Sequence, residues 1–188
     1  MCHYITATLP PDADLATIAA IFDNCKFGFE LIDNAHIMAQ LPAGSRYILT
    51  TRKHCDCGTV LGSLTHTAES PTGVPKHDVE RVRKQGWSEA KIKRWLTEKQ
   101  AVREKDERKA QHQAEGGKQA AKPWLDLLTA VLESGTTKQL GILLHWYKSG
   151  VANERIRLKD TITTRLVEVT PDFLMTMKED VLYRFTSN

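Results

Sequence analysis

The sequence lacks the features that mark several large classes of protein. Its 188 residues contain no stretch close to the roughly 18 consecutive apolar residues that a membrane-spanning helix needs. The first ten residues do not combine a basic start with an apolar run, so they do not have the pattern of a secretory signal. From these two absences we predict a cytoplasmic protein with no membrane partner.

The common short motifs of catalytic sites are also missing. The chain contains none of the patterns H-E-x-x-H, G-x-S-x-G, G-x-x-x-x-G-K-[ST] and G-x-G-x-x-G. These patterns mark zinc proteases, serine hydrolases, P-loop proteins and dinucleotide-binding proteins. The sequence therefore gives no support to any of these four hypotheses.

Cysteine is scarce, with four residues in the whole chain. Thiols stay reduced in the cytosol, so we expect free, metal-bound or reactive cysteines and no disulfide framework. Two of the four stand in the run His54-Cys55-Asp56-Cys57-Gly58. The other two are Cys2, which is followed by His3, and Cys25.

The 54–58 run is a candidate zinc site, because thiolate sulfur and imidazole nitrogen are the ligands that zinc prefers. In an extended segment, Cys55 and Cys57 lie on the same side of the chain and could share an ion with Cys2. Either Cys25 or His3 could complete a set of four ligands. The candidate ligands are therefore Cys2, His3, Cys25, His54, Cys55 and Cys57.

The same run also permits an interpretation without metal. Free cysteine is among the most buried residue types and packs as a small hydrophobic side chain. Asp56 and Gly58 are typical turn residues, so the run could simply be a packed turn.

A third interpretation is a reactive thiol. Basic neighbours favour the thiolate, and Arg52, Lys53 and His54 directly precede Cys55. A zinc- or thiol-dependent enzyme centred on His54, Cys55 and Cys57 is therefore an alternative function. Adjacency in sequence does not supply the side-chain geometry that a nucleophile and its base require.

Charge is distributed unevenly along the chain, although the net charge is only +3. Between Lys76 and Lys122, fourteen Lys and Arg residues stand against eight Asp and Glu residues, so this part carries +6 and the remainder −3. A helix is expected over residues 78–85, followed by Gly86 and a second helix from Ser88. This outline of a helix-turn-helix could bind nucleic acid through residues 78–122. Its candidate phosphate contacts are Lys91, Lys93, Arg94, Lys99 and Arg103. Interspersed acidic residues favour instead a solvated or partner-binding arm, since affinity depends on how many phosphates are neutralised.

The first sixty residues predict the order β-α-β-β-β. β-forming residues over 3–9 predict a strand, and Asp14 is the expected N-cap of the following helix. Further strands are expected over residues 29–32, 37–41 and 46–52, and a loop over 63–77.

The second half predicts mainly helices, followed by strands. A helix from Ser88 is expected to end at Gly116-Gly117, and helices over 124–134 and 140–147 follow Pro123. Strands are expected over residues 155–158, 163–169 and 181–185, with a short helix starting at Thr170-Pro171.

Together these patterns predict an α+β fold. A mostly antiparallel sheet, built from N- and C-terminal strands, packs on buried helices and carries a protruding basic helical insertion. The expected parts are 1–77, 78–122 and 123–188. For function we expect a small cytosolic binding protein without catalytic activity, with a structural zinc site as an option and another protein as its partner. A toxin-neutralising immunity or inhibitor protein is an example of this class.

Overall fold

The computed structural model describes residues 2–52, 54–62 and 82–187, with backbone alone for residues 102–103 and 105–114. The chain divides into two compact units, one formed by residues 1–66 and 117–188 and the other by residues 67–116. The loop expected over 63–77 and most of the helix expected over 78–85 lie outside the described residues.

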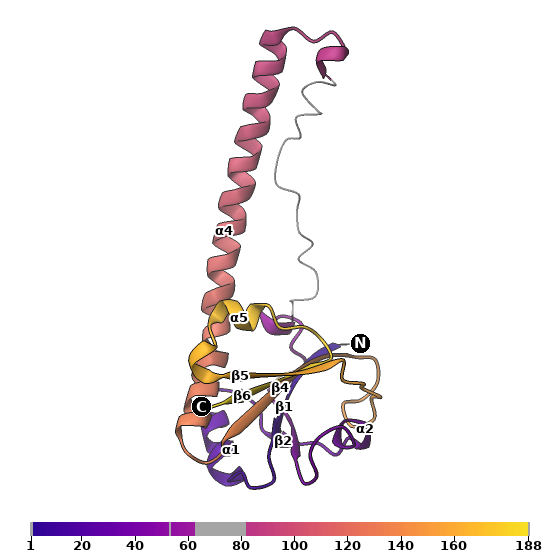
Figure 1. Ribbon diagram of the computed structural model, residues 1–188, viewed down its shortest axis with the longest axis vertical. Helices are drawn as coiled ribbons and strands as arrows, with labels where there is room; N and C mark the ends of the chain where they lie inside the picture. The colour runs from indigo at the N-terminus through magenta and orange to yellow at the C-terminus, as the bar shows by residue number, and fades with distance from the viewer. Residues whose placement is uncertain (1, 53, 63–81, 188) are drawn as a thin grey trace. The chain divides into compact units, whose positions relative to one another are not determined.

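A six-stranded sheet forms the centre of the first unit (Figure 1). Its strand order is β2-β3-β1-β4-β6-β5, and every neighbouring pair is antiparallel except β5 and β6. The predicted α+β class and the mostly antiparallel sheet are confirmed. The strands are β1 (Cys2–Leu9), β2 (Glu30–Leu31), β3 (Arg46–Leu49), β4 (Gln139–Tyr147), β5 (Asp160–Arg165) and β6 (Val181–Thr186).

Helices cover both faces of this sheet. The helix α1 (Leu15–Asn24) and the C-terminal part of α4 (Glu89–Glu133) pack on one face, where their apolar residues form the larger core cluster. The short helix α2 (Ala35–Met38) packs on the opposite face, and Figure 1 shows this separation. As expected, Asp14 is the N-cap of α1, where its carboxylate accepts hydrogen bonds from the first turn.

The prediction of a helix over residues 140–147 is wrong, because these residues belong to the strand β4. β4 lies between β1 and β6 and is buried on both faces. Ile142 and Leu144 pack in the larger core cluster, whereas Leu143 and Tyr147 pack in the smaller one. A strand covered on both faces shows a continuous apolar run, and periodicity alone does not separate such a run from a buried helix.

The strand expected over residues 37–41 is also wrong, because Ala35–Met38 form the helix α2. The side-chain oxygen of Asn34 accepts hydrogen bonds from the backbone N–H groups of His36 and Ile37. This N-cap satisfies two donors that a helix start otherwise leaves without partners, so it stabilises helix in place of strand. The first elements therefore follow the order β-α-β-α-β.

The helix α4 continues through Gly116, Gly117 and Pro123, so the prediction that it ends at the two glycines is wrong. A Cβ atom at Gly117 would lie 2.6 Å from the Cε atom of Met175. Gly117 therefore permits close packing of Met175 against the helix. Burial of the apolar residues after Pro123 outweighs the helix-breaking tendency of these three residues.

In the C-terminal part of the chain, some predicted elements are confirmed and others are wrong. The expected strand over 155–158 is irregular, and the one over 163–169 begins at Asp160 and passes into the 3₁₀ helix η2 (Leu166–Glu168). Thr170 caps α5 (Pro171–Met175) as expected, and β6 follows where the last strand was predicted.

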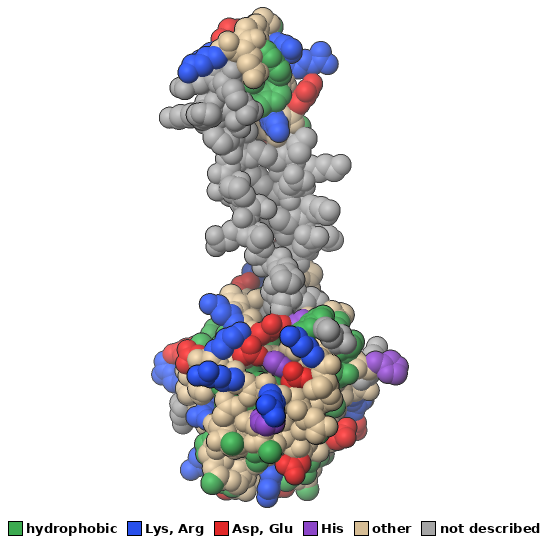
Figure 2. Space-filling view, turned by 90° about the vertical axis from the view of Figure 1, so that its right-hand side faces the viewer, with side chains coloured by type: hydrophobic (Ala, Val, Ile, Leu, Met, Phe, Trp, Pro, Cys, Tyr) green, Lys and Arg blue, Asp and Glu red, His purple; other side chains and the backbone are tan. Residues whose placement is uncertain are grey.

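The surface of the first unit is mixed in character. On the face seen in Figure 2, basic, acidic and histidine side chains are interspersed, and hydrophobic side chains are scattered. Among the described residues, no helix combines the length and the apolar character that crossing a membrane requires.

Candidate metal centre

The chain after β3 lies along the first half of β1. The strand pairing between β1 and β3 ends at Thr6 and Leu49. Beyond it, Thr50 donates its backbone N–H to the carbonyl of Ile5 at 3.2 Å, and Asp56 donates its own to the carbonyl of His3 at 2.9 Å. The cysteine run is therefore a loop held against β1 by main-chain hydrogen bonds.

Asp56 fixes the conformation of this loop. Its side chain is buried, and its Oδ2 atom accepts hydrogen bonds from the backbone N–H of Ile5 at 2.8 Å and from the Thr51 hydroxyl. Its carbonyl oxygen accepts two more from Thr59, from the backbone N–H and from the hydroxyl. Burial raises the pKa of the Asp56 carboxyl, against the opposing effect of the two hydrogen bonds to Oδ2. Sequence reasoning treated Asp56 only as a turn residue, and its place between two cysteines is the one signal of this positioning role.

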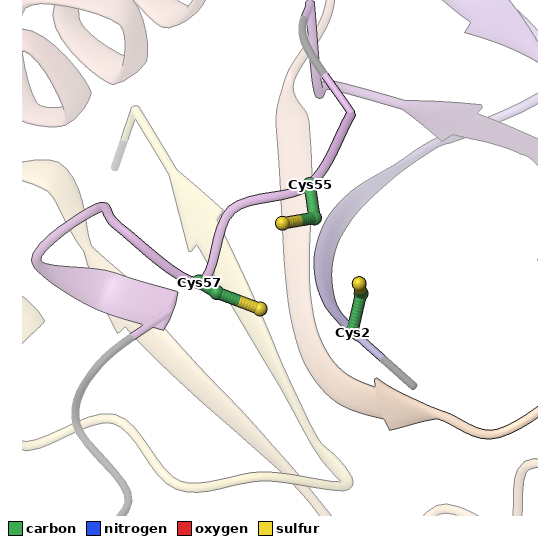
Figure 3. Close-up of side chains that lie close together, drawn as sticks. All are labelled: Cys2, Cys55 and Cys57. Carbon is green, nitrogen blue, oxygen red and sulfur yellow. The ribbon is translucent and has the colours of Figure 1, made fainter.

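Three thiols converge beside this anchor. The Sγ atoms of Cys2, Cys55 and Cys57 all lie within 4.8 Å of one another, and each residue is half-buried. Figure 3 shows the three side chains close together, with Cys55 and Cys57 on the loop and Cys2 at the start of β1. The sulfur ligands of a tetrahedral zinc ion lie roughly 3.8 Å apart, given Zn–S bonds of about 2.3 Å. The cluster could therefore hold a metal ion after small side-chain adjustments.

Cys55 and Cys2 differ in their tendency to ionise. Hydrogen bonds from the backbone N–H and the side chain of Cys57 lower the pKa of Cys55. A hydrogen bond with Cys55, together with desolvation, raises the pKa of Cys2. Neighbouring thiolates repel one another, so a bound divalent cation would favour deprotonation of the whole cluster.

The strand β1 adds a main-chain contact to the cluster. The backbone N–H of His3 donates to the Sγ atom of Cys57 at 3.2 Å. This hydrogen bond ties the side chain of Cys57 to the main chain of β1.

The other three predicted ligands lie outside this group of sulfur atoms. Cys25 is the C-cap residue of α1 and packs against the larger core cluster. His3 places its Nδ1 atom 3.1 Å from a carboxylate oxygen of Glu179, and its ring packs edge-on against Trp146. His54 is exposed. Among the described residues, the structure thus brings together Cys2, Cys55 and Cys57 and leaves Cys25 and the two histidines apart.

The basic candidates of the second unit lie on α4. The described residues 82–84 are helical, Gly86 has a positive φ of 78°, and the Ser88 hydroxyl accepts a hydrogen bond from the N–H of Lys91. A helix followed by a tight turn and a second helix is thus present in the described part. The positive φ explains why glycine stands at this turn.

These basic residues are spread around the helix. At about 100° per residue, their positions do not gather on one face. Arg94 pairs with Glu98 at 3.2 Å, and the Lys91 ammonium lies 4.0 Å above the ring of Trp87. The five candidates Lys91, Lys93, Arg94, Lys99 and Arg103 all belong to α4, and the first four are exposed.

Comparison with known proteins does not assign a family. No protein-family model matches this chain, and neither the curated proteins nor the solved structures give a significant match. The chemistry of the site is therefore the basis for a functional proposal.

Proposed function

We propose that this chain is a zinc-binding protein in which Cys2, Cys55 and Cys57 hold the ion. The observation that supports the proposal is the convergence of three sulfur atoms, within 4.8 Å of one another, from two segments that are far apart in the sequence. The hydrogen bonds of Asp56 hold the loop that carries two of these sulfur atoms against the strand that carries the third.

The donor set selects the class of metal. Thiolates suit zinc and other thiophilic ions, whereas calcium and magnesium prefer oxygen ligands. Zinc is the proposed ion because it is redox-inactive, is commonly bound by cysteine and tolerates three protein ligands with a fourth position for water or another molecule. A cytosolic chain with reduced thiols is compatible with this chemistry.

A bound ion would join the start of β1 to the loop after β3. Cys2 is the first residue of β1, and the end of a strand frays more readily than its centre unless other contacts hold it. Metal ligation would order this end of the sheet without a disulfide. This role agrees with the expectation of a binding protein that acts without catalysis, in which the ion stabilises the fold.

The test is metal analysis of protein that carries no added tag before Met1, because added residues would adjoin Cys2. We expect one equivalent of zinc per chain after reducing purification. Replacement of zinc by cobalt should give the intense thiolate-to-cobalt absorption of a sulfur-rich tetrahedral site. The substitutions Cys2→Ser, Cys55→Ser and Cys57→Ser should each weaken zinc binding by at least about 10-fold.

Cys25→Ser is the matched control, since it removes one thiol from the same chain outside the cluster. It should retain the full equivalent of zinc. A protein that takes up no zinc after reconstitution under reducing conditions would contradict the proposal, as would equal loss of zinc in the Cys25→Ser variant.

A further inference from the structure

A charged pocket of about 550 Å³ lies in the first unit and shares no lining residue with the cysteine cluster. Its walls come from three parts of the chain: β4, the irregular segment before β5, and the turn before β6. This volume is within the range of roughly 300–1,000 Å³ that is usual for small-molecule sites. The lining residues are His145, Arg155, Arg157, Leu158, Lys159 and Asp180.

The segment before β5 presents its cations to solvent because alternate residues anchor it. Ile156 is buried in the smaller core cluster and Leu158 packs against that cluster. The side chain of Gln40 donates to the carbonyl of Ile156 at 2.8 Å and accepts from the N–H of Leu158 at 2.9 Å. The Gln40 side chain thus makes the hydrogen bonds that a neighbouring strand would otherwise make. These bonds hold the backbone of the segment that carries Arg155 and Arg157.

The acidic group of the pocket is already paired. Asp180 lies 2.7 Å from the Nζ atom of Lys159 and 2.5 Å from the Nδ1 atom of His145. Its backbone has a positive φ of 63°, an uncommon conformation for a residue other than glycine. Main-chain hydrogen bonds to Leu144 and from Lys159 hold this conformation and keep the carboxylate between its two partners.

A second carboxylate, that of Glu154, adjoins the pocket and is also engaged. Its Oε2 atom accepts hydrogen bonds from the backbone N–H groups of Lys148 and Ser149 and from the Ser149 hydroxyl. Its Oε1 atom lies 4.0 Å from the Nε2 atom of His145.

Two guanidinium groups are left without such partners. Within the described part of the chain, the side chains of Arg155 and Arg157 form no ion pair and no hydrogen bond, and both are exposed. Two cations at alternate positions of one anchored segment create a local surplus of positive charge. Guanidinium groups present several N–H donors in a planar fork that matches phosphate oxygens.

We propose that this pocket binds a small phosphomonoester through Arg155 and Arg157. Lys159, held by Asp180, adds positive charge to the wall, and Leu158 offers an apolar contact for the organic part of the ligand. The proposal is independent of the zinc site, because the two sites share no lining residue. The pocket volume of about 550 Å³ matches a small molecule.

The test is titration of the full-length protein with phenyl phosphate and with inorganic phosphate at constant ionic strength. Calorimetry gives the affinity, and amide chemical shifts locate the site. Phenol is the neutral control ligand. Arg46→Ala is the matched control variant, since it removes an exposed arginine of β3 that does not line the pocket.

We expect saturable binding of one phenyl phosphate per chain, with weaker binding of inorganic phosphate and none of phenol. Arg155→Ala and Arg157→Ala should each weaken binding by about 10-fold, the double variant should weaken it further, and Arg46→Ala should change it by less than about 2-fold. The absence of saturable binding, or unchanged affinity in the double variant, would overturn the proposal. Tighter, arginine-dependent binding of a single-stranded oligonucleotide would overturn the choice of a small ligand.

Discussion

The carboxylate of Asp56 accepts the backbone N–H of Ile5 at 2.8 Å, and this contact joins residues 51 positions apart in the sequence. It satisfies a main-chain donor of β1 at the point where β3 no longer pairs with that strand. The cysteines on either side of Asp56 are thereby placed next to Cys2. A single buried carboxylate thus contributes to both the fold and the candidate metal centre.

Asp56→Ala should lower the free energy of unfolding by about 1–3 kcal/mol, because it leaves the buried N–H of Ile5 without an acceptor. Asp56→Asn retains one side-chain carbonyl oxygen, which can accept hydrogen bonds from both Ile5 and Thr51. Its free energy of unfolding should therefore fall by less than that of Asp56→Ala. Urea unfolding of the metal-free protein measures both values. Equal stability of the alanine variant and the unsubstituted protein would show that the contact contributes nothing.

Zinc should stabilise the folded chain in proportion to its affinity. At a free zinc concentration about 100 times the Kd, the gain is about 2.7 kcal/mol, and a chelator should abolish it. Thermal unfolding with and without zinc measures the shift. At the same zinc concentration, the gain should fall to about 1.4 kcal/mol or less in Cys57→Ser and persist in full in Cys25→Ser. Because the thiols must lose protons to bind, proton release should accompany zinc binding, and the affinity should fall as the pH is lowered.

The ion pairs of Asp180 predict a loss of stability in acid. Burial raises the pKa of this carboxyl, but the hydrogen bonds with Lys159 and His145 outweigh burial and hold the pKa below its usual value. The ionised carboxylate of Asp180 therefore stabilises the folded chain. This contribution to the free energy of unfolding is complete above the pKa of the unfolded chain, about 3.9, and is lost as the pH falls through the lower pKa of the folded chain.

Asp180→Asn should remove this part of the acid dependence, which denaturant unfolding at a series of pH values measures. Asparagine tolerates the positive φ at this position, so the substitution tests the charge without added backbone strain. Asp33→Asn, at an exposed position, is the control. Parallel stability curves for the unsubstituted protein and Asp180→Asn below pH about 5 would contradict the assignment.

Gly141 should not accept a side chain. A Cβ atom there would lie 2.1 Å from the Oγ1 atom of Thr8, its partner across the β1–β4 pair. We expect Gly141→Ala to destabilise the protein by about 1–3 kcal/mol. Gly150→Ala is the control, since nothing lies within 4 Å of its Cβ position. If the clash is the cause, adding Thr8→Ala should recover part of the stability lost in Gly141→Ala.

Local signals in the sequence were sufficient for several elements. Asp14 and Thr170 cap the helices that follow them, as their side chains predict. The strands at both ends of the chain also lie where β-forming residues indicate. These features depend on a few neighbouring residues, so they can be recognised without knowledge of the rest of the chain.

Elements that depend on long-range packing were not predictable in the same way. The apolar run of β4 is a strand because β1 and β6 pair with it on both sides. Met175, far along the chain, packs where a side chain at position 117 would lie, so a glycine stands inside the helix α4 at this point. Neither contact can be recognised from the hydrophobic periodicity of the neighbouring residues.

The sequence by itself determined the α+β class and identified the cysteine run with Cys2 as a candidate metal site, because composition, pattern and residue chemistry are local properties. Only the tertiary structure decided which candidates meet. It placed Cys2 beside Cys55 and Cys57, left Cys25 against the core, and assembled the Arg155–Arg157 pocket from three separate segments. The physical reason is that ligand geometry depends on distances between side chains, and strand pairing and core packing set those distances across long separations in sequence.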